Sequence, residues 1–361
     1  MYRTMAASAL EGIRMYPGRV QESIRELDQC QSSRELLIAS LLALIFSHRK
    51  CQVIDKETVA QLEAKLRENR KQANEMGLYY AGLFLLLSGR LEKAKEYIDR
   101  MIKMSPNFKE GLILKGWLEV QSGSDEDITS MNHSAMNYFD ISSKFNDPDV
   151  IIGKSKVLEK NSSFIGGVEQ LNQAIVLYPR FLPAFIEKMK LQACLKDWEQ
   201  VVDTAFRALA IDKHCLDAQR YLIVYSMAWD NNQEAASSKL LDLIASFEIR
   251  EPKNADLYYE SAKLFARIAF RNEEILTHSM NLIERAVFLD PTNIVIICEH
   301  AFQCMLLNRM TDAQRHYKNA TKMDETSIMG LTGLLHCQLI EGQKGVEEQL
   351  DSLEEFNKAT G

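Results

Sequence analysis

Residues that interrupt helices are scarce in this sequence. Only seven of the 361 residues are proline and 16 are glycine. Runs of 18 or more apolar residues are also absent, and the richest stretch, residues 36–46, is too short to cross a bilayer. The first ten residues carry one arginine and no apolar core, unlike a signal peptide. We therefore expect a helical chain without membrane insertion.

Motifs for catalysis or metal binding are equally scarce. The seven cysteines are odd in number and follow no disulfide framework, which favours a reducing, cytoplasmic compartment. No CxxC spacing, glycine-rich phosphate loop, HExxH or GxSxG motif occurs. Cys298, His300 and Cys304 suggest a metal site, but residues at i, i+2 and i+6 of one helix do not converge on one point. For these residues, and for the pair His336–Cys337, small buried cysteines are the favoured interpretation.

Two further patterns do not indicate a binding or catalytic site either. Gly166–Gly167 follows a helical turn rather than a strand, so it is not a dinucleotide-binding fingerprint. Glu273–Glu274 stands where a helix should begin, and acidic residues there favour the helix dipole. We therefore predict no catalytic residue, no metal ligand, no cofactor and no small-molecule ligand.

The charge is uneven along the chain. The net charge is −7; basic residues outnumber acidic ones by 18 to 14 in residues 1–110 and are outnumbered by 36 to 25 afterwards. This is no nucleic-acid-binding pattern. The acidic part either recruits a basic partner or forms a solvated face, and the solvated face is favoured.

Two segments have a functional and a structural interpretation. A polar helix predicted over residues 55–71 could hold an acidic partner, although pairing with its own glutamates is favoured. An acidic loop predicted over residues 124–130 offers phosphorylation sites, although a helix-starting role explains it equally well. The basic residues of the first segment are Lys56, Lys65, Arg67, Arg70 and Lys71, and the hydroxyl groups of the second belong to Thr129 and Ser130.

The stretch from Glu75 to Pro106 carries the tetratricopeptide pattern, a helix–turn–helix unit of about 34 residues. Gly82 and Ala94 stand where the paired helices should cross, so they must be small. Gly89 stands in the turn, where φ > 0 is expected. The other pattern residues are Leu78, Ala81, Leu85, Ile98 and Met101. One such pair cannot bury its own apolar face, so the pattern predicts stacked neighbours.

The register continues to the end of the chain and predicts about nine units. The expected fold is all-α, a tetratricopeptide-repeat solenoid in which antiparallel helix pairs form a right-handed superhelix. We divide it into an incomplete repeat at 1–30, repeats over 31–250, and further repeats over 251–361, with a hinge at 251–254. A first helix is expected to be missing after Pro17, and one helix is expected over residues 345–357.

Several stretches are not dictated by repeat packing and resemble one family, the tetratricopeptide repeat domain 21 family, the long repeat subunit of intraflagellar transport complex A. The stretches are Tyr79–Phe84, Lys93–Lys103, Phe181–Phe185, Lys188–Gln192, Asp324–Ser327 and Cys337–Gln343. The resemblance spans residues 6–358, and of the two paralogues it favours the A form. The family chain is several times longer, so this sequence resembles its N-terminal part or a short isoform.

The resemblance implies a non-catalytic scaffold for retrograde ciliary transport and cilium assembly. Its partners would be other subunits of complex A, and its location the cytoplasm, the ciliary base and the axoneme. Two alternatives remain: a co-chaperone or adaptor that binds peptide segments, and a helical regulatory part of a larger enzyme. The co-chaperone needs lysine and arginine clustered on adjacent first helices. The excess of acidic over basic residues after residue 110 argues against such a cluster.

Overall fold

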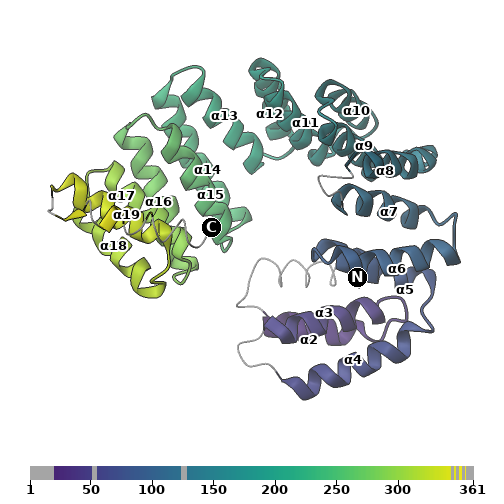
Figure 1. The fold of residues 1–361 in the computed structure, drawn as a ribbon. Helices are drawn as coiled ribbons and strands as arrows, with labels where there is room; N and C mark the ends of the chain where they lie inside the picture. Colours follow the sequence, from purple (N-terminus) through teal and green to yellow (C-terminus); the bar gives the residue numbers. More distant parts are fainter. Residues whose placement is uncertain are drawn as a thin grey trace. The chain divides into compact units, whose positions relative to one another are not determined.

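The protein is helical throughout the part that the computed structural model describes, namely residues 20–50, 55–122, 128–342, 345–346, 349–351 and 354 (Figure 1). These residues contain no β-strand, and successive helices run antiparallel in stacked pairs. The all-α prediction and the stacked helix pairs are therefore confirmed. The helices form two compact units, which meet between Val201 and Val202 within one helix.

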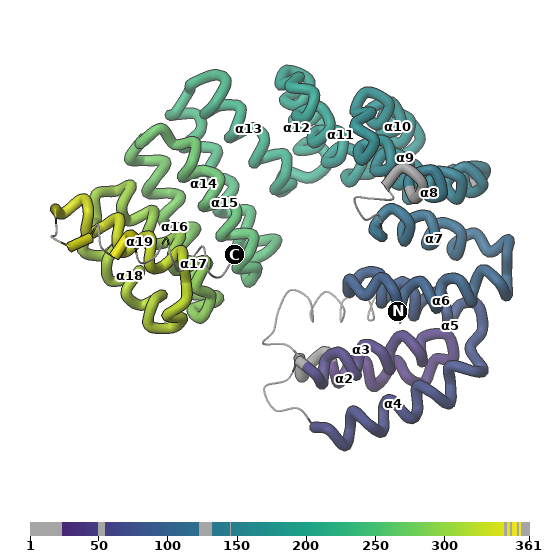
Figure 2. Tube along the Cα trace, viewed as in Figure 1, coloured from purple at the N-terminus to yellow at the C-terminus, as the bar shows by residue number. Residues whose placement is uncertain are grey.

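The helices of the first unit have similar lengths, and consecutive helices run in opposite directions (Figure 2). In chain order they are α2 (Val20–Cys30), α3 (Leu37–Lys50), α4 (Lys56–Arg70), α5 (Glu75–Leu87), α6 (Leu91–Met104), α7 (Lys109–Ser122), α8 (Ile128–Ser142), the 3₁₀ turn η2 (Ser143–Phe145), α9 (Pro148–Lys160), α10 (Phe164–Leu177), α11 (Leu182–Cys194) and the start of α12 (Trp198–Ile211).

The second unit continues the same alternation from the rest of α12. Its helices are α13 (Leu216–Ala228), α14 (Gln233–Arg250), α15 (Ala255–Ile268), α16 (Glu273–Leu289), α17 (Ile294–Leu306), α18 (Met310–Met323) and α19 (Ile328–Ile340). The helix predicted over residues 55–71 corresponds to α4 to within one residue at each end.

Asparagine, aspartate and serine side chains begin many of the helices. Asn74, for example, accepts the backbone N–H of Gly77 at 2.8 Å, which satisfies a donor that the first turn of α5 leaves unpaired. The turns inside the pairs need a left-handed residue. Gly89 has φ +73°, as predicted, and Gly342 has φ +68°.

The helix pairs approach closely at small residues. A Cβ added to Gly82 would lie 2.7 Å from Cγ1 of Ile98 on the paired helix, and Ala94 is fully buried. Gly82 and Ala94 are thus small for the predicted reason. The first unit contains one apolar cluster around Leu78 and Leu85 and another around Phe139, and the second unit contains one around Phe265 and Ile283.

The N-terminal segment is only partly described. α2 runs from Val20 to Cys30 and packs against α3, with Leu27 buried beside Leu44. Residues 1–19, which include Pro17 and most of the incomplete repeat predicted over residues 1–30, lie outside the described residues. Most of the helix predicted over residues 345–357 also lies outside them, although Val346 is buried.

The loop prediction over residues 124–130 is wrong at its end. α8 begins at Ile128, so residues 128–130 are helical rather than part of a loop. Ile128 and Met131 are three residues apart, a spacing that an α-helix accommodates. The acidic composition of the segment had suggested a loop instead. The domain limits at residues 30 and 250, and the hinge at 251–254, stay predictions.

Candidate interaction surface

The first helices of successive pairs contact one another within each unit. In the first unit, α5, α7, α9 and α11 form such a series, and in the second unit α13, α15, α17 and α19 do so (Figure 2). We call each series a first-helix row. A row presents side chains from several repeats side by side, which is how repeat proteins bind extended partners.

Ion pairs cross the first-helix row between α9 and α11. Lys156 of α9 bonds to Glu187 of α11, and Lys190 of α11 pairs with Glu159 of α9 at 2.7 Å. Lys156 also lies 3.2 Å from Glu159, so four charges form one network. Although burial alone would raise it, the ammonium groups of Lys190 and Lys156 hold the pKa of Glu159 below its usual range.

A second charged contact joins α15 to α17. Arg267 donates two hydrogen bonds to the carboxylate of Glu299, at 2.8 and 2.7 Å, and its guanidinium lies 4.2 Å from the ring centre of Phe302. Only 4% of the Glu299 side chain is exposed, against 43% for Arg267. Gln303 donates to the same carboxylate and accepts from the hydroxyl of Ser279 on α16. The charge on Glu299 is therefore fixed in place by its partners.

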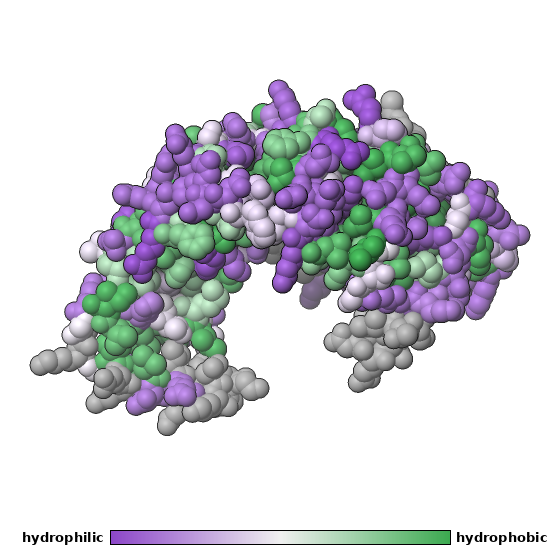
Figure 3. Space-filling view, turned by 90° about the horizontal axis from the view of Figure 1, so that it is seen from above, coloured by the Kyte–Doolittle hydropathy of each residue, from purple (hydrophilic) through white to green (hydrophobic). Residues whose placement is uncertain are grey.

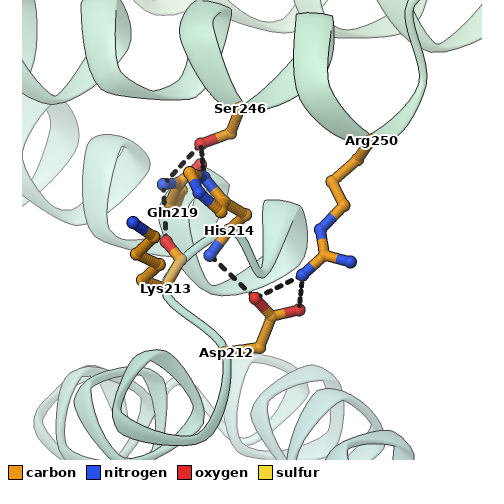
Figure 4. Close-up of polar contacts among 6 residues, drawn as sticks. All are labelled: Asp212, Lys213, His214, Gln219, Ser246 and Arg250. Atoms are coloured by element: carbon orange, nitrogen blue, oxygen red, sulfur yellow. Dashed lines mark hydrogen bonds and ion pairs between the residues drawn. The ribbon is translucent and has the colours of Figure 1, made fainter.

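A polar cluster fixes the connection between α12 and α13 to the end of α14 (Figure 4). Arg250 donates to both carboxylate oxygens of Asp212 at 2.6 Å, and the same carboxylate accepts the backbone N–H of His214 at 3.0 Å. Ser246 accepts from Gln219 at 3.0 Å and lies 3.1 Å from Nδ1 of His214. The His214 hydrogen bond and the nearby Arg250 guanidinium hold the pKa of Asp212 below its usual range.

The basic residues predicted on helix 55–71 lie on α4 and on the residue after it, and several are paired. Arg70 lies 2.9 Å from Glu96 of α6 and stacks on the ring of Tyr97. Lys65 donates to the side chain of Gln31, and Arg67 is 3.9 Å from Glu63 of its own helix. These residues are spread over contacts with three helices or their ends, so they do not form one open basic patch.

The other residues that the sequence analysis considered and rejected as site residues lie within helices of the fold. Gly167 is buried in α10, where a Cβ would lie 2.6 Å from Leu191, and Glu274 in the first turn of α16 accepts the hydroxyl of Ser237 at 2.7 Å. Cys337 is buried in α19 and His336 is exposed. The side chains of Thr129 and Ser130 lie outside the described part of the structure, so their modification stays a prediction.

His300 and Cys304 do come together with a third side chain. The potential ligand atoms of His300, Cys304 and His316 all lie within 4.8 Å of one another, whereas Cys298 is not part of this group. Burial lowers the pKa of His300 to about 4 and that of His316 below its usual value, and it raises the pKa of Cys304 to about 11. The sequence analysis missed His316 because it lies on α18, the helix paired with α17. A His-x₃-Cys pair facing a histidine across the turn is the signal that could have found it.

Hydrophilic residues cover much of the face seen in Figure 3, with hydrophobic residues in small groups among them. Exposed apolar side chains nevertheless include four aromatic ones, and two of these, Trp229 and Phe270, lie just after the last residues of first helices. The other two are Phe206 and Phe288. No described helix is long and apolar enough to span a bilayer.

Two family models match the chain. One, the tetratricopeptide repeat protein 21 N-terminal ARM repeat, covers residues 9–202, and the other, the second ARM domain of the same protein, covers residues 238–361. Among known relatives, human tetratricopeptide repeat protein 21B is 39% identical over 95% of this chain and human 21A is 33% identical over the same share. The predicted preference for the A paralogue is therefore not supported.

The chain spans about a quarter of the length of these relatives, 26% in both cases. Among solved structures, yeast Tom70 has a TM-score of 0.49 and 11% identity, with 98% of this chain and 84% of that chain covered. The Cut9 assembly of the anaphase-promoting complex has a TM-score of 0.48 and 12% identity, with 92% and 62% covered.

Proposed function

The chain belongs to the tetratricopeptide repeat protein 21 family, and we propose that it is a protein-interaction scaffold of intraflagellar transport complex A. In this role it acts as a subunit or a short isoform in retrograde ciliary transport and cilium assembly. Its location is the cytoplasm, the ciliary base and the axoneme. Its family is one of non-catalytic repeat proteins, so it acts by binding.

The observation that carries this proposal is the family match over both parts of the chain, residues 9–202 and 238–361. The first-helix rows supply a suitable surface. Their charged residues are held by partners on neighbouring first helices, as Lys190 is by Glu159 and Arg267 by Glu299. Such side chains lose little conformational entropy when a partner protein binds, which favours recognition.

The co-chaperone alternative needs free positive charge on adjacent first helices. Instead, Lys115 lies 2.8 Å from both Asp99 and Glu119, and Lys156 and Arg267 are paired as described above. These carboxylates would compete with an acidic peptide for the same ammonium and guanidinium groups. A complex of folded subunits, with mixed charges across the interface, fits the rows better.

The test is affinity purification of the tagged chain from ciliated cells, with quantitative mass spectrometry. We expect subunits of complex A to be enriched over a tag-only sample. Recovery of chaperones without those subunits would instead favour the co-chaperone, and enrichment of neither would refute the proposal.

Charge-reversal variants locate the surface. Lys190→Glu on α11 and Lys263→Glu on α15 change the first-helix rows, and we expect each to reduce recovery of the subunits severalfold. Lys95→Glu on α6 and Lys318→Glu on α18 carry the same charge change on exposed positions of second helices. These two controls should leave the recovery unchanged, and equal losses in all four variants would exclude the rows as the binding surface.

A further inference from the structure

Three metal-binding side chains from two helices meet in the second unit. His300 and Cys304 lie one turn apart on α17, so they point to the same side of that helix, and His316 lies on the paired helix α18. We propose that these three residues bind a zinc ion that links α17 to α18. The site is additional to the scaffold function and does not depend on it.

The spacing of the ligand atoms is close to that of a zinc site. All three lie within 4.8 Å of one another, whereas nitrogen and sulfur atoms on one tetrahedral zinc lie roughly 3.3–3.8 Å apart. Side-chain rotations that move the ligand atoms by about 1 Å would close the difference. The two imidazole rings already lie near each other, with centres 4.2 Å apart.

A hydrogen-bonded core histidine does not explain His300. Only 8% of this residue is exposed, and its Nδ1 atom has no hydrogen-bond partner among the described residues. Nearly all buried polar atoms in folded proteins have such a partner, because a buried atom without one loses its hydrogen bonds to water and gains none in return. Coordination of a metal ion through Nδ1 would satisfy this nitrogen.

The chemical type of the donor atoms indicates which kind of metal ion the site would bind. Two imidazole nitrogens and one thiolate suit zinc, whereas calcium and magnesium require oxygen ligands. Two arginines lie nearby, but both pair with Asp312, Arg309 at 2.9 Å and Arg315 at 3.3 Å. The single carboxylate of Asp312 therefore offsets one of the two positive charges beside the site. Three protein ligands leave the fourth zinc position to a water molecule.

Zinc at this position would hold α17 against α18. α17 also carries Glu299, which pairs with Arg267 across the first-helix row. The ion would therefore fix a helix that contributes to the proposed interaction surface, and it would bind folded protein in preference to unfolded protein.

The test uses cobalt(II) as a spectroscopic probe for zinc in the purified full chain. After treatment with a chelator, we expect one cobalt ion per chain to give a thiolate-to-cobalt charge-transfer band, which added zinc removes. Cys304→Ala should abolish the band. Cys298→Ala is the matched control, because that buried cysteine lies on the same helix outside the group, and it should keep the band.

A second measurement examines the histidines. Competition with a chromogenic chelator should show zinc binding at least tenfold weaker in His316→Gln, and circular dichroism should show that this variant remains helical. If His316→Gln fails to fold, zinc must still raise the unfolding temperature of the Cys298→Ala control. Absence of a thiolate band in the unaltered chain, or an equal band in Cys304→Ala, would overturn the proposal.

Discussion

At the scale of single residues, replacing a helical glycine by alanine should destabilise or stabilise the fold, depending on which atoms surround the added Cβ. At Gly82 an added Cβ would lie 2.7 Å from the fully buried Ile98, which cannot move aside without disturbing the core. At Gly166 the nearest atom is the hydroxyl of Ser163, 3.1 Å away, on an exposed side chain that can rotate. We expect Gly82→Ala to destabilise by roughly 1–3 kcal/mol and Gly166→Ala to stabilise by about 0.5–1 kcal/mol. Urea unfolding midpoints will measure both, and midpoints that shift in the same direction would contradict this assignment.

The Arg267–Glu299 pair gives a second prediction at this scale. Arg267→Ala leaves the Glu299 carboxylate buried without its guanidinium, which we expect to destabilise by roughly 2–3 kcal/mol, less than for a fully buried pair because Arg267 is half exposed. Adding Glu299→Gln should recover part of the loss, since a neutral amide costs less to bury. Arg67→Ala, at an 82% exposed side chain, is the control and should stay within about 0.5 kcal/mol. A double variant no more stable than Arg267→Ala would show that the charge is not the cause.

Residues differ in how far the sequence could predict them. Gly82, Ala94 and Gly89 were predictable because the repeat fixes their surroundings in advance. The grouping of His300 with His316 was not, because it depends on how two helices turn relative to each other rather than on spacing along one helix.

At the scale of elements, the connections between helix pairs are held by side-chain contacts that the repeat pattern does not specify. The Asp212–Arg250 pair joins the connection between α12 and α13 to the end of α14 (Figure 4). Because the pKa of Asp212 is lowered in the folded state, its ionised form stabilises the fold above the pKa of the unfolded carboxyl group, about 3.9. This contribution is lost as the pH falls through the folded-state value.

We therefore expect Asp212→Asn to lower the unfolding temperature by a constant amount between pH 5 and 8, and by a progressively smaller amount as the pH falls below about 4 towards the lowered pKa of the folded-state carboxyl group. Calorimetry or circular dichroism across this range will test it. Asp203→Asn is the control, because Asp203 is more exposed and lies 3.9 Å from Arg207. A difference between wild type and Asp212→Asn that persists unchanged at pH 3 would show that the charge of Asp212 is unimportant.

How well the first and last residues of a helix could be predicted also depended on local sequence signals. Bounds were predicted well where glycine marks a turn, as at Gly89, which separates α5 from α6 and has φ +73°. The start of α8 was not, because the acidic and hydroxyl-rich residues before it are compatible with a loop and with a first helical turn.

At the scale of the whole molecule, the main contacts between described helices join helices one or two places apart in the chain, such as α5 with α7 and α17 with α19. In such an array stability is approximately a sum of repeat and nearest-neighbour terms. A local change should therefore act on its own repeat and the adjoining ones, and its effect should fade along the chain.

Amide hydrogen exchange tests this with two perturbations at distant places. Gly82→Ala should lower protection in α5, α6 and the adjoining α7, and leave α15–α18 unchanged, since α5 and α17 belong to different clusters. Zinc added to the unaltered chain should raise protection in α17 and α18 and leave α5–α7 unchanged, and Cys304→Ala should remove that rise. Equal changes in both places would mean that the chain unfolds as one cooperative body, which would refute the nearest-neighbour description whatever the outcome at the zinc site.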